Sequence, residues 1–355
     1  MAILRANWGA SGLEAFVCFL RRWIMDARFD VVGIGNAIVD VLAHADDAFL
    51  TRHAMTKGSM ALIDAAAADA LYAAMEPGIE CSGGSAANTI ACLASLGGRG
   101  AFIGKVRDDE LGKVFHHDIE ALGVHFPTTP ASAGASTARC LINVTPDAQR
   151  TMSTFLGACV ELGPNDVDED VIRASKVTYL EGYLWDREEA KAAFVKAAEL
   201  AHAAGREVSL SLSDAFCVDR HRTSFIELVE GHVDVLFANE DEIKSLYQVD
   251  TFDAALQHVR GHCKVAALTR SAKGAVVVAG EEIHIVDAEA GVKVVDTTGA
   301  GDAFAAGFLH GYTSGGHNDL AQCARIGAMA AAEVIGHFGA RPETPLNELV
   351  AKKLG

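Results

Sequence analysis

Short apolar runs rich in β-branched residues alternate along the chain with Ala-rich stretches in which apolar residues recur every three or four positions. The first pattern is typical of buried strands and the second of amphipathic helices. Their alternation predicts an α/β fold with a mainly parallel sheet and helices on both faces. The predicted strands are residues 29–35, 101–106, 176–183, 207–211, 233–238, 264–269 and 274–279. The predicted helices are residues 64–75, 86–96, 109–122, 187–204, 240–247, 252–261, 301–312 and 319–337.

Two strand-like segments, residues 39–63 and 136–155, do not fit this alternation, and the second contains a turn at Thr145-Pro146-Asp147. We expect them to leave the main sheet and pair into a small β lid over the ends of the parallel strands, where such folds bind ligands. No repeat or linker divides the chain, so residues 25–355 are predicted to form one domain with both segments inserted. Residues 1–24 are predicted to be a disordered extension, because the run 15–20 is too short for a membrane span and lacks the charges of a secretory signal.

Composition and charge exclude several classes of protein and partner. Half of the 355 residues are apolar and 22% are charged, which excludes disorder, collagen and coiled coil. The formal net charge of −17 disfavours nucleic acid as a partner. The eight cysteines form no C-x-x-C pair, which favours reduced thiols and a cytoplasmic location without a membrane partner.

The most informative segment is Asp296-Thr-Thr-Gly299-Ala300-Gly301-Asp302, which follows a predicted β run at 292–295 and opens a helix of small residues. Free N–H groups and the positive end of the helix dipole would make this turn an anion site. A carboxylate there would repel a bound phosphate, so we interpret Asp302 as a base that takes a hydroxyl proton during phosphoryl transfer. The alternative is that Asp302 only caps the helix.

Three further polar features are weaker by themselves. Asn88 follows a glycine cluster at 81–84 and lies one turn into an apolar helix. Asn36 and Asp40 follow the first strand and offer an amide and a carboxylate to sugar hydroxyls, although a turn motif is the favoured explanation when they are considered alone. Glu242 begins a helix, where acids commonly complement the dipole, but beside a phosphate site it is a candidate for a water-mediated Mg²⁺ contact.

Other phosphate-binding motifs fail. The segment beginning Gly33-Ile-Gly35 lacks the third glycine of the dinucleotide fingerprint, which disfavours a dehydrogenase. Residues 99–106 approach a P-loop but have Arg in place of the first Gly and Val in place of the Ser or Thr, so Lys105 is interpreted as a strand-end residue.

Together these segments resemble the ribokinase (PfkB-type) family of sugar and nucleoside kinases, from about residue 30 to the end of the chain. The first family signature resembles Gly83-Gly84-Ser-Ala-Ala-Asn88 with its continuation through Gly104 to Gly112, and the second resembles residues 296–307. The resemblance implies a ribokinase-like fold, a small-molecule acceptor, and ATP with Mg²⁺. It leaves open a monovalent cation and the choice between monomer and homodimer.

Several segments look most like the adenosine kinases of that family, among them residues 35–40, 149–151, 181–183, 212–216 and 233–240. That resemblance implies Asp302 as base and Gly299, Ala300 and Gly301 as an anion hole. It also implies a set of substrate-binding residues: Asn36, Asp40, Gly83, Gly84, Asn88, Phe155 and Tyr183. On the nucleotide side it implies Asn239, Thr269, Arg270 and Gly274 for ATP, with Glu242 for water-mediated Mg²⁺.

The sequence therefore predicts an ATP-dependent kinase that phosphorylates the 5′-hydroxyl of adenosine to AMP, in purine salvage. Residues 153–157 and Asp214 differ from what is expected of the eukaryotic adenosine kinases. This difference weakens the prediction of purine selectivity more than the prediction of catalysis. The alternative is a kinase of a free sugar or sugar acid, such as ribose, fructose or keto-deoxygluconate, for which Arg150 is the lid residue able to bind an acid. A more distant alternative is a non-catalytic nucleotide-sensing module.

Overall fold

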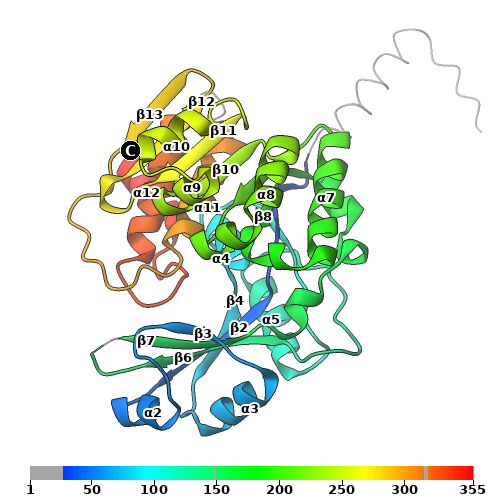
Figure 1. Cartoon of the computed structure of the whole chain (residues 1–355), viewed down its shortest axis with the longest axis vertical. Coiled ribbons are helices and arrows are strands. Elements are labelled where there is room, and N and C mark those ends of the chain that lie inside the picture. Colours follow the sequence, from blue (N-terminus) through cyan, green and yellow to red (C-terminus); the bar gives the residue numbers. More distant parts are fainter. Residues whose placement is uncertain (1–26, 148, 316–318, 355) are drawn as a thin grey trace, which may run out of the picture.

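The computed structural model describes residues 27–147, 149–315 and 319–354, so the extension predicted at 1–24 lies outside it. An eight-stranded sheet has the order β13-β12-β11-β10-β9-β8-β1-β5, and a second, five-stranded sheet forms the lower lobe in Figure 1. The strands of the large sheet are β1 (Phe29–Ile34), β5 (Gly100–Ile103), β8 (Ser175–Glu181), β9 (Glu207–Ser211), β10 (Val235–Asn239), β11 (Val265–Thr269), β12 (Ala275–Ala279) and β13 (Glu282–Val286). Six of them pair in parallel, and β12 and β13 add an antiparallel edge.

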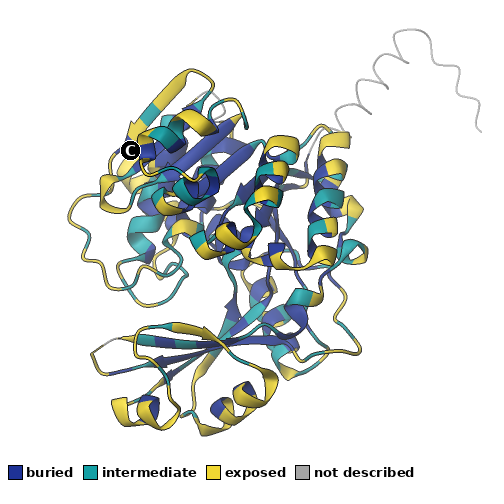
Figure 2. Cartoon of the chain, viewed as in Figure 1, coloured by how far each residue is buried: buried dark blue, intermediate teal, exposed yellow. Residues whose placement is uncertain are grey.

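Helices cover both faces of the large sheet, as the sequence predicted. Alternation along β10 explains this, because Val235 and Phe237 contribute to one apolar cluster and Leu236 and Ala238 to the other. One cluster is completed by α4 (Ser85–Ser95), α5 (Glu110–Ala121), α11 (Ala300–Thr313) and α12 (Leu320–Val334). The other is completed by α6 (Glu169–Arg173), α7 (Glu188–Ala203), α8 (Ala215–His232), α9 (Glu240–Tyr247) and α10 (Phe252–Val259). Figure 2 shows the buried strands between helices whose outer sides are exposed.

The smaller sheet has the order β3-β7-β6-β2-β4 and joins the two segments that the sequence set apart. Its strands are β2 (Ile38–His44), β3 (Met60–Leu62), β4 (Ile79–Gly83), β6 (Ala138–Val144) and β7 (Arg150–Phe155). The expected pairing is confirmed, because β2 pairs in parallel with β6 over seven residues, from Ile38 with Ala138 to His44 with Val144. The helices α2 (Asp47–Arg52) and α3 (Ala65–Ala74) accompany this lid in Figure 1.

Several elements differ from the sequence prediction. Residues 292–295 form no strand, because Val295 N–H donates to Ile335 O in a loop instead of joining a ladder. The strands β4 and β13 were missed, and so were the helices α6, α8 and α13 (Leu346–Leu354). The segment 39–63 is not strand-like throughout, because α2 lies within it. The helix α8 is kinked at His221, where the backbone leaves helical geometry. None of the helices in the described ranges is long and apolar enough to cross a membrane.

Candidate active site

Two glycine turns, each opening a helix, meet at one carboxylate. Helix α4 begins after Gly84, whose φ of +98° and contact with Asn36 O leave no room for a Cβ atom. Helix α11 begins after Gly299, which has a φ of +78°. Ser85 Oγ donates a 2.6 Å hydrogen bond to Asp302 Oδ1. The structure therefore brings together the two motifs that the sequence singled out, although they lie 217 residues apart.

Asp302 lies in the first turn of α11, as predicted, and burial raises its pKa from 3.8 to about 6. Hydrogen bonds from the side chains of Ser85 and Asn88 oppose that shift, because they stabilise the charged form. At neutral pH the carboxylate is therefore deprotonated, yet its proton affinity is higher than that of an exposed aspartate. This is the combination that a general base requires.

The turn before α11 is held from several directions. Asp296 Oδ1 accepts from Thr298 N–H at 3.0 Å and from Thr298 Oγ at 2.7 Å. Its Oδ2 accepts from Gly339 N–H and from Arg150 on lid strand β7, and both side chains of this ion pair are less than a tenth exposed. The lid is thus tied directly to the turn.

The predicted anion hole is only partly open in this structure. Ala300 N–H donates to Thr297 O at 3.2 Å, and Gly299 lies against Ala340. A Cβ atom added at Gly301 would meet nothing within 4 Å, so Gly301 borders open space. The helix N-terminus presents its dipole to that space.

Four of the residues predicted to bind the acceptor, Asn36, Asp40, Gly83 and Gly84, lie together where β1 leads into lid strand β2 and β4 leads into α4. Asn36 Nδ2 donates to Glu181 Oε1 at 2.6 Å, and Asn36 Oδ1 is buried without a hydrogen-bond partner among the described residues. Asp40 lies against Gly83, where an added Cβ atom would be 2.5 Å from Asp40 Oδ2. Burial raises the pKa of Asp40 to about 6, against the charges of Arg341 and Arg150.

Two charged residues of this region were missed from the sequence. Glu181 ends β8, is 1% exposed, and accepts from Asn36 and from Ala86 N–H at 2.8 Å, while burial raises its pKa to about 7. A charged residue at the carboxyl end of a buried strand was a signal that the sequence offered. Arg341 lies in a loop 253 residues after Asn88 and donates to Asn88 Oδ1 at 3.2 Å. No local sequence pattern predicts this contact.

The two predicted aromatic residues lie on different parts of the fold. Phe155 ends lid strand β7 below the guanidinium of Arg139, 6.0 Å from the ring centroid. Tyr183 lies in the 3₁₀ turn Gly182–Asp186 after β8 and is 43% exposed. Burial of its hydroxyl raises the pKa of Tyr183, and so do the nearby charges of Asp214 and Asp302. Tyr183 therefore lies within electrostatic reach of the base.

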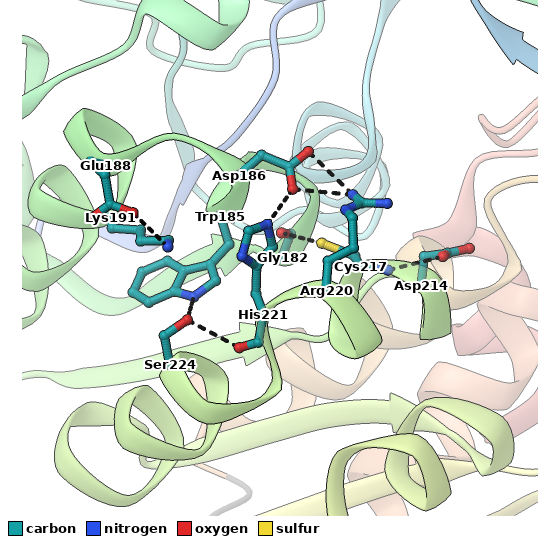
Figure 3. A network of polar contacts seen from close by, with 10 residues as sticks. All are labelled: Gly182, Trp185, Asp186, Glu188, Lys191, Asp214, Cys217, Arg220, His221 and Ser224. Carbon is teal, nitrogen blue, oxygen red and sulfur yellow. Dashed lines mark hydrogen bonds and ion pairs between the residues drawn. The ribbon is translucent and has the colours of Figure 1, made fainter.

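Helix α8 fixes the turn that carries Tyr183 (Figure 3). Trp185 Nε1 donates to Ser224 Oγ at 2.9 Å, and Cys217 Sγ donates to Gly182 O at 3.2 Å. Asp186 accepts from Arg220 and contacts His221 Nε2 at 2.5 Å. The kinked helix thus holds both ends of the turn.

The residues predicted for ATP line a separate hollow of about 470 Å³ beside the N-terminus of α9. Asn239, Thr269 and Arg270 belong to its wall, with Glu240 and Lys273. Arg270 pairs with Glu240 at 3.0 Å and lies 4.0 Å above the ring of Phe252. Gly274, with a φ of +79°, closes the turn by accepting from Arg270 N–H at 2.7 Å.

Glu242 forms a capping box with Asn239. Its Oε2 accepts from Asn239 N–H at 2.9 Å and its Oε1 from Asn239 Nδ2 at 2.5 Å, while burial raises its pKa to about 7. Both oxygens therefore have partners already, which fits a contact with hydrated Mg²⁺ better than direct ligation. Across residues 27–147, 149–315 and 319–354, no group of three acidic, His or Cys side chains is arranged to hold a metal.

Comparison with known proteins places this site in a family. Residues 79–347 match the pfkB family carbohydrate kinase. The structure of adenosine kinase from Sinorhizobium meliloti is 53% identical, covers 93% of this chain and 100% of its own, and superposes with a TM-score of 0.84. A probable sugar kinase from Rhizobium etli is 51% identical, covers 92% of this chain and 99% of its own, with the same TM-score of 0.84.

A more distant relative, adenosine kinase of Saccharomyces cerevisiae, is 26% identical over 345 residues, which cover 91% of this chain and 99% of that protein. The predicted ribokinase-like fold and the predicted transfer of a phosphoryl group to an alcohol are confirmed by these matches. The chain belongs to the pfkB family of carbohydrate kinases.

Proposed function

We propose that this protein transfers the γ-phosphoryl group of ATP to the 5′-hydroxyl of adenosine, giving AMP and ADP. The observation that carries the proposal is the partly buried carboxylate of Asp302, which lies where two helix-opening glycine turns meet. One turn belongs to the predicted acceptor cradle and the other to the predicted anion hole. A base between the two is positioned to serve a hydroxyl that attacks a phosphoryl group.

In this proposal Asp302 accepts the 5′-hydroxyl proton in or after the transition state. Asp40 and Asn88, with Gly84 and Asn36 beside them, hold the ribose hydroxyls. The N–H groups and dipole of the turn 299–301 stabilise the charge on the transferred group. ATP occupies the hollow beside Asn239, Thr269 and Arg270. Glu242 would contact the waters of Mg²⁺ held by the ATP phosphates, and this ion would supply positive charge to offset theirs.

Two observations favour adenosine as the acceptor. Tyr183 is partly exposed and lies within electrostatic reach of Asp302, so its ring can offer a flat apolar surface to a purine. The Sinorhizobium meliloti protein, which is 53% identical over nearly the whole chain, is an adenosine kinase.

A free sugar or sugar acid is the second candidate acceptor. Arg341 and Arg150 both lower the pKa of Asp40, so two guanidinium groups lie close to the acceptor cradle. Such groups suit a carboxylate on the substrate. The Rhizobium etli relative, 51% identical, is a probable sugar kinase.

The experiment is ADP release from Mg-ATP with adenosine, inosine, ribose, fructose and keto-deoxygluconate as acceptors. Adenosine is expected to give the fastest turnover, and Asp302→Asn is expected to reduce it at least ~10³-fold while adenosine binding by calorimetry is retained, because the base is lost and the cradle is not. Asp253→Asn, which removes an exposed carboxylate in the first turn of α10, is the matched control.

Turnover on a sugar alone would move the proposal to the second candidate. Retained turnover in Asp302→Asn would remove Asp302 from the mechanism. Binding of ATP without turnover on any acceptor would support a sensing module instead.

A further inference from the structure

The loop between α12 and α13 touches both halves of the candidate active site. Gly339 N–H donates to Asp296 Oδ2 at 3.1 Å, and Ala340 lies against Gly299, where an added Cβ atom would be 2.7 Å from Ala340 Cα. The next residue, Arg341, reaches the acceptor side. Three consecutive residues therefore contact the phosphoryl-side turn and the acceptor cradle.

The guanidinium of Arg341 is held between two acceptors. Its Nε donates to Asn88 Oδ1 at 3.2 Å, and its Nη1 donates to Asp118 Oδ2 at 3.3 Å. Asp118 Oδ2 also accepts from Ser82 N–H at 2.8 Å and from Ser82 Oγ, which fixes the carboxylate to lid strand β4. The side chain of Arg341 is 19% exposed, so these contacts form in a largely desolvated place.

The contact with Arg341 decides which way the amide of Asn88 faces. An amide has one acceptor oxygen and one donor NH₂ group. Because the oxygen of Asn88 accepts from Arg341, its NH₂ group is left to face Asp302. Asn88 follows Ser85 by three residues on α4 and so lies on the side of the helix from which Ser85 Oγ donates to Asp302, and the Asn88 amide lowers the pKa of Asp302 as a donor does. The reversed amide would set NH₂ against guanidinium and a carbonyl against a carboxylate, two unfavourable pairs.

We propose that Arg341 is a positioning residue for the base: it orients Asn88 so that the amide donates to Asp302. This inference rests on the proposed role of Asp302. Four side chains then form a connected series from the lid to the reacting centre: Asp118, Arg341, Asn88 and Asp302. This series of side chains transfers no proton. Its role is to orient the amide of Asn88 toward Asp302.

The proposal has a consequence for the pH dependence of catalysis. Hydrogen bonds from Asn88 and Ser85 lower the pKa of Asp302, so an unoriented Asn88 would let that pKa rise. The protonated, inactive form of Asp302 would then persist to higher pH. The other titratable groups that respond to the charge of Asp302 are Cys92 on α4, Tyr179 and Glu181 on β8, Tyr183 after β8, and Glu242 on α9.

The test compares pH profiles of kcat and kcat/KM for wild type, Arg341→Met and Arg341→Lys, with whichever acceptor of the panel wild type phosphorylates. Arg341→Met is expected to lower kcat roughly tenfold, as for the loss of one hydrogen bond to a charged group, and to move the acid limb upward by ~0.5–1 pH unit. KM for ATP is expected to stay unchanged. Arg341→Lys keeps a positive charge near Asp40 but loses the guanidinium that donates to Asn88 and Asp118 at once. Its acid limb is therefore expected to move upward nearly as far as that of Arg341→Met.

Two controls separate positioning from a merely structural role. Arg325→Met changes an exposed arginine on α12 and is expected to leave both profiles unchanged. In an Asn88→Ala background, Arg341→Met is expected to add no further shift of the acid limb, because the amide through which Arg341 acts is gone. Arg341→Lys supplies the profile if Arg341→Met does not fold.

An unchanged acid limb in folded Arg341 variants would overturn the inference, and so would an undiminished shift in the Asn88→Ala background. Those results would leave the proposed function intact. Absence of acceptor-dependent turnover in wild type would instead contradict the proposed function itself.

Discussion

The carboxyl group of Asp302 combines burial, which raises its pKa to about 6, with two hydrogen bonds that keep the charged form accessible. A base must be deprotonated before it accepts a proton. We therefore expect kcat/KM for the acceptor to fall as the pH drops through about 6, because the raised pKa leaves Asp302 protonated below that value.

The contribution of Ser85 to this acid limb, the fall of kcat/KM at low pH, can be measured directly. Ser85→Ala removes a 2.6 Å hydrogen bond that lowers the pKa of Asp302, so the acid limb is expected to move to higher pH by ~0.5–1 unit. Ser59→Ala, in the lid, removes a hydroxyl that bonds only locally to Thr56 O and serves as the control. A limb that stays in place would show that another group, such as Asp40 or Glu181, sets it.

Residues whose roles depend on local pattern were predictable from the sequence. Asp302, Gly299 and Gly84 lie where a turn opens a helix, and such turns have a strong signature. Arg341 was not predicted, because its role comes from a contact with Asn88, which lies 253 residues away. Glu181 was marked only by its charge at the end of a buried strand, and its partner Asn36 lies 145 residues away. Sequence spacing carries no record of such contacts.

Among the elements, the link between lid strand β7 and the turn before α11 bears most directly on function. The ion pair of Arg150 with Asp296 is buried, so loss of one partner leaves the other charge uncompensated. We expect Arg150→Gln to loosen the lid and admit water. Phosphate release from ATP, measured relative to acceptor phosphorylation, is then expected to rise several-fold.

The control for that experiment is Lys57→Gln, which removes ion pairs with Asp47 and Asp147 that stay within the lid. An unchanged ratio of hydrolysis to transfer in Arg150→Gln would contradict a role of this pair in lid closure. A changed ratio in both variants would point to general destabilisation of the lid.

Element prediction succeeded where burial dominates and failed where it does not. The parallel strands of the core were found because their residues are apolar on both faces, as along β10. Helix α8 was missed because its sequence is polar and its axis kinks at His221. Residues 292–295 have the β-branched composition of a strand, yet Val294 and Val295 are exposed and no neighbouring strand receives them.

At the scale of the whole molecule, two sheets meet around one reaction centre. The large sheet contributes the turn after β8 that carries Tyr183, and the small sheet contributes Asp40, Arg150 and, after β4, the glycine turn that opens α4. Asp302 itself follows the loop before α11. The sequence predicted both sheets and the pairing of the two inserted segments, since patterns of apolar residues record which strands exist. It did not predict that β4 and α3 belong with the small sheet, because strand pairing is a long-range property.

The central claim is that Asp302 serves a 5′-hydroxyl. The most direct measurement is ³¹P NMR of the products formed from Mg-ATP with adenosine and, in parallel, with 5′-deoxyadenosine, which lacks only the acceptor hydroxyl. The account predicts AMP phosphorylated at the 5′ position from adenosine, and competitive inhibition without product from 5′-deoxyadenosine. Phosphorylation of 5′-deoxyadenosine, or a phosphate at another hydroxyl of adenosine, would contradict it.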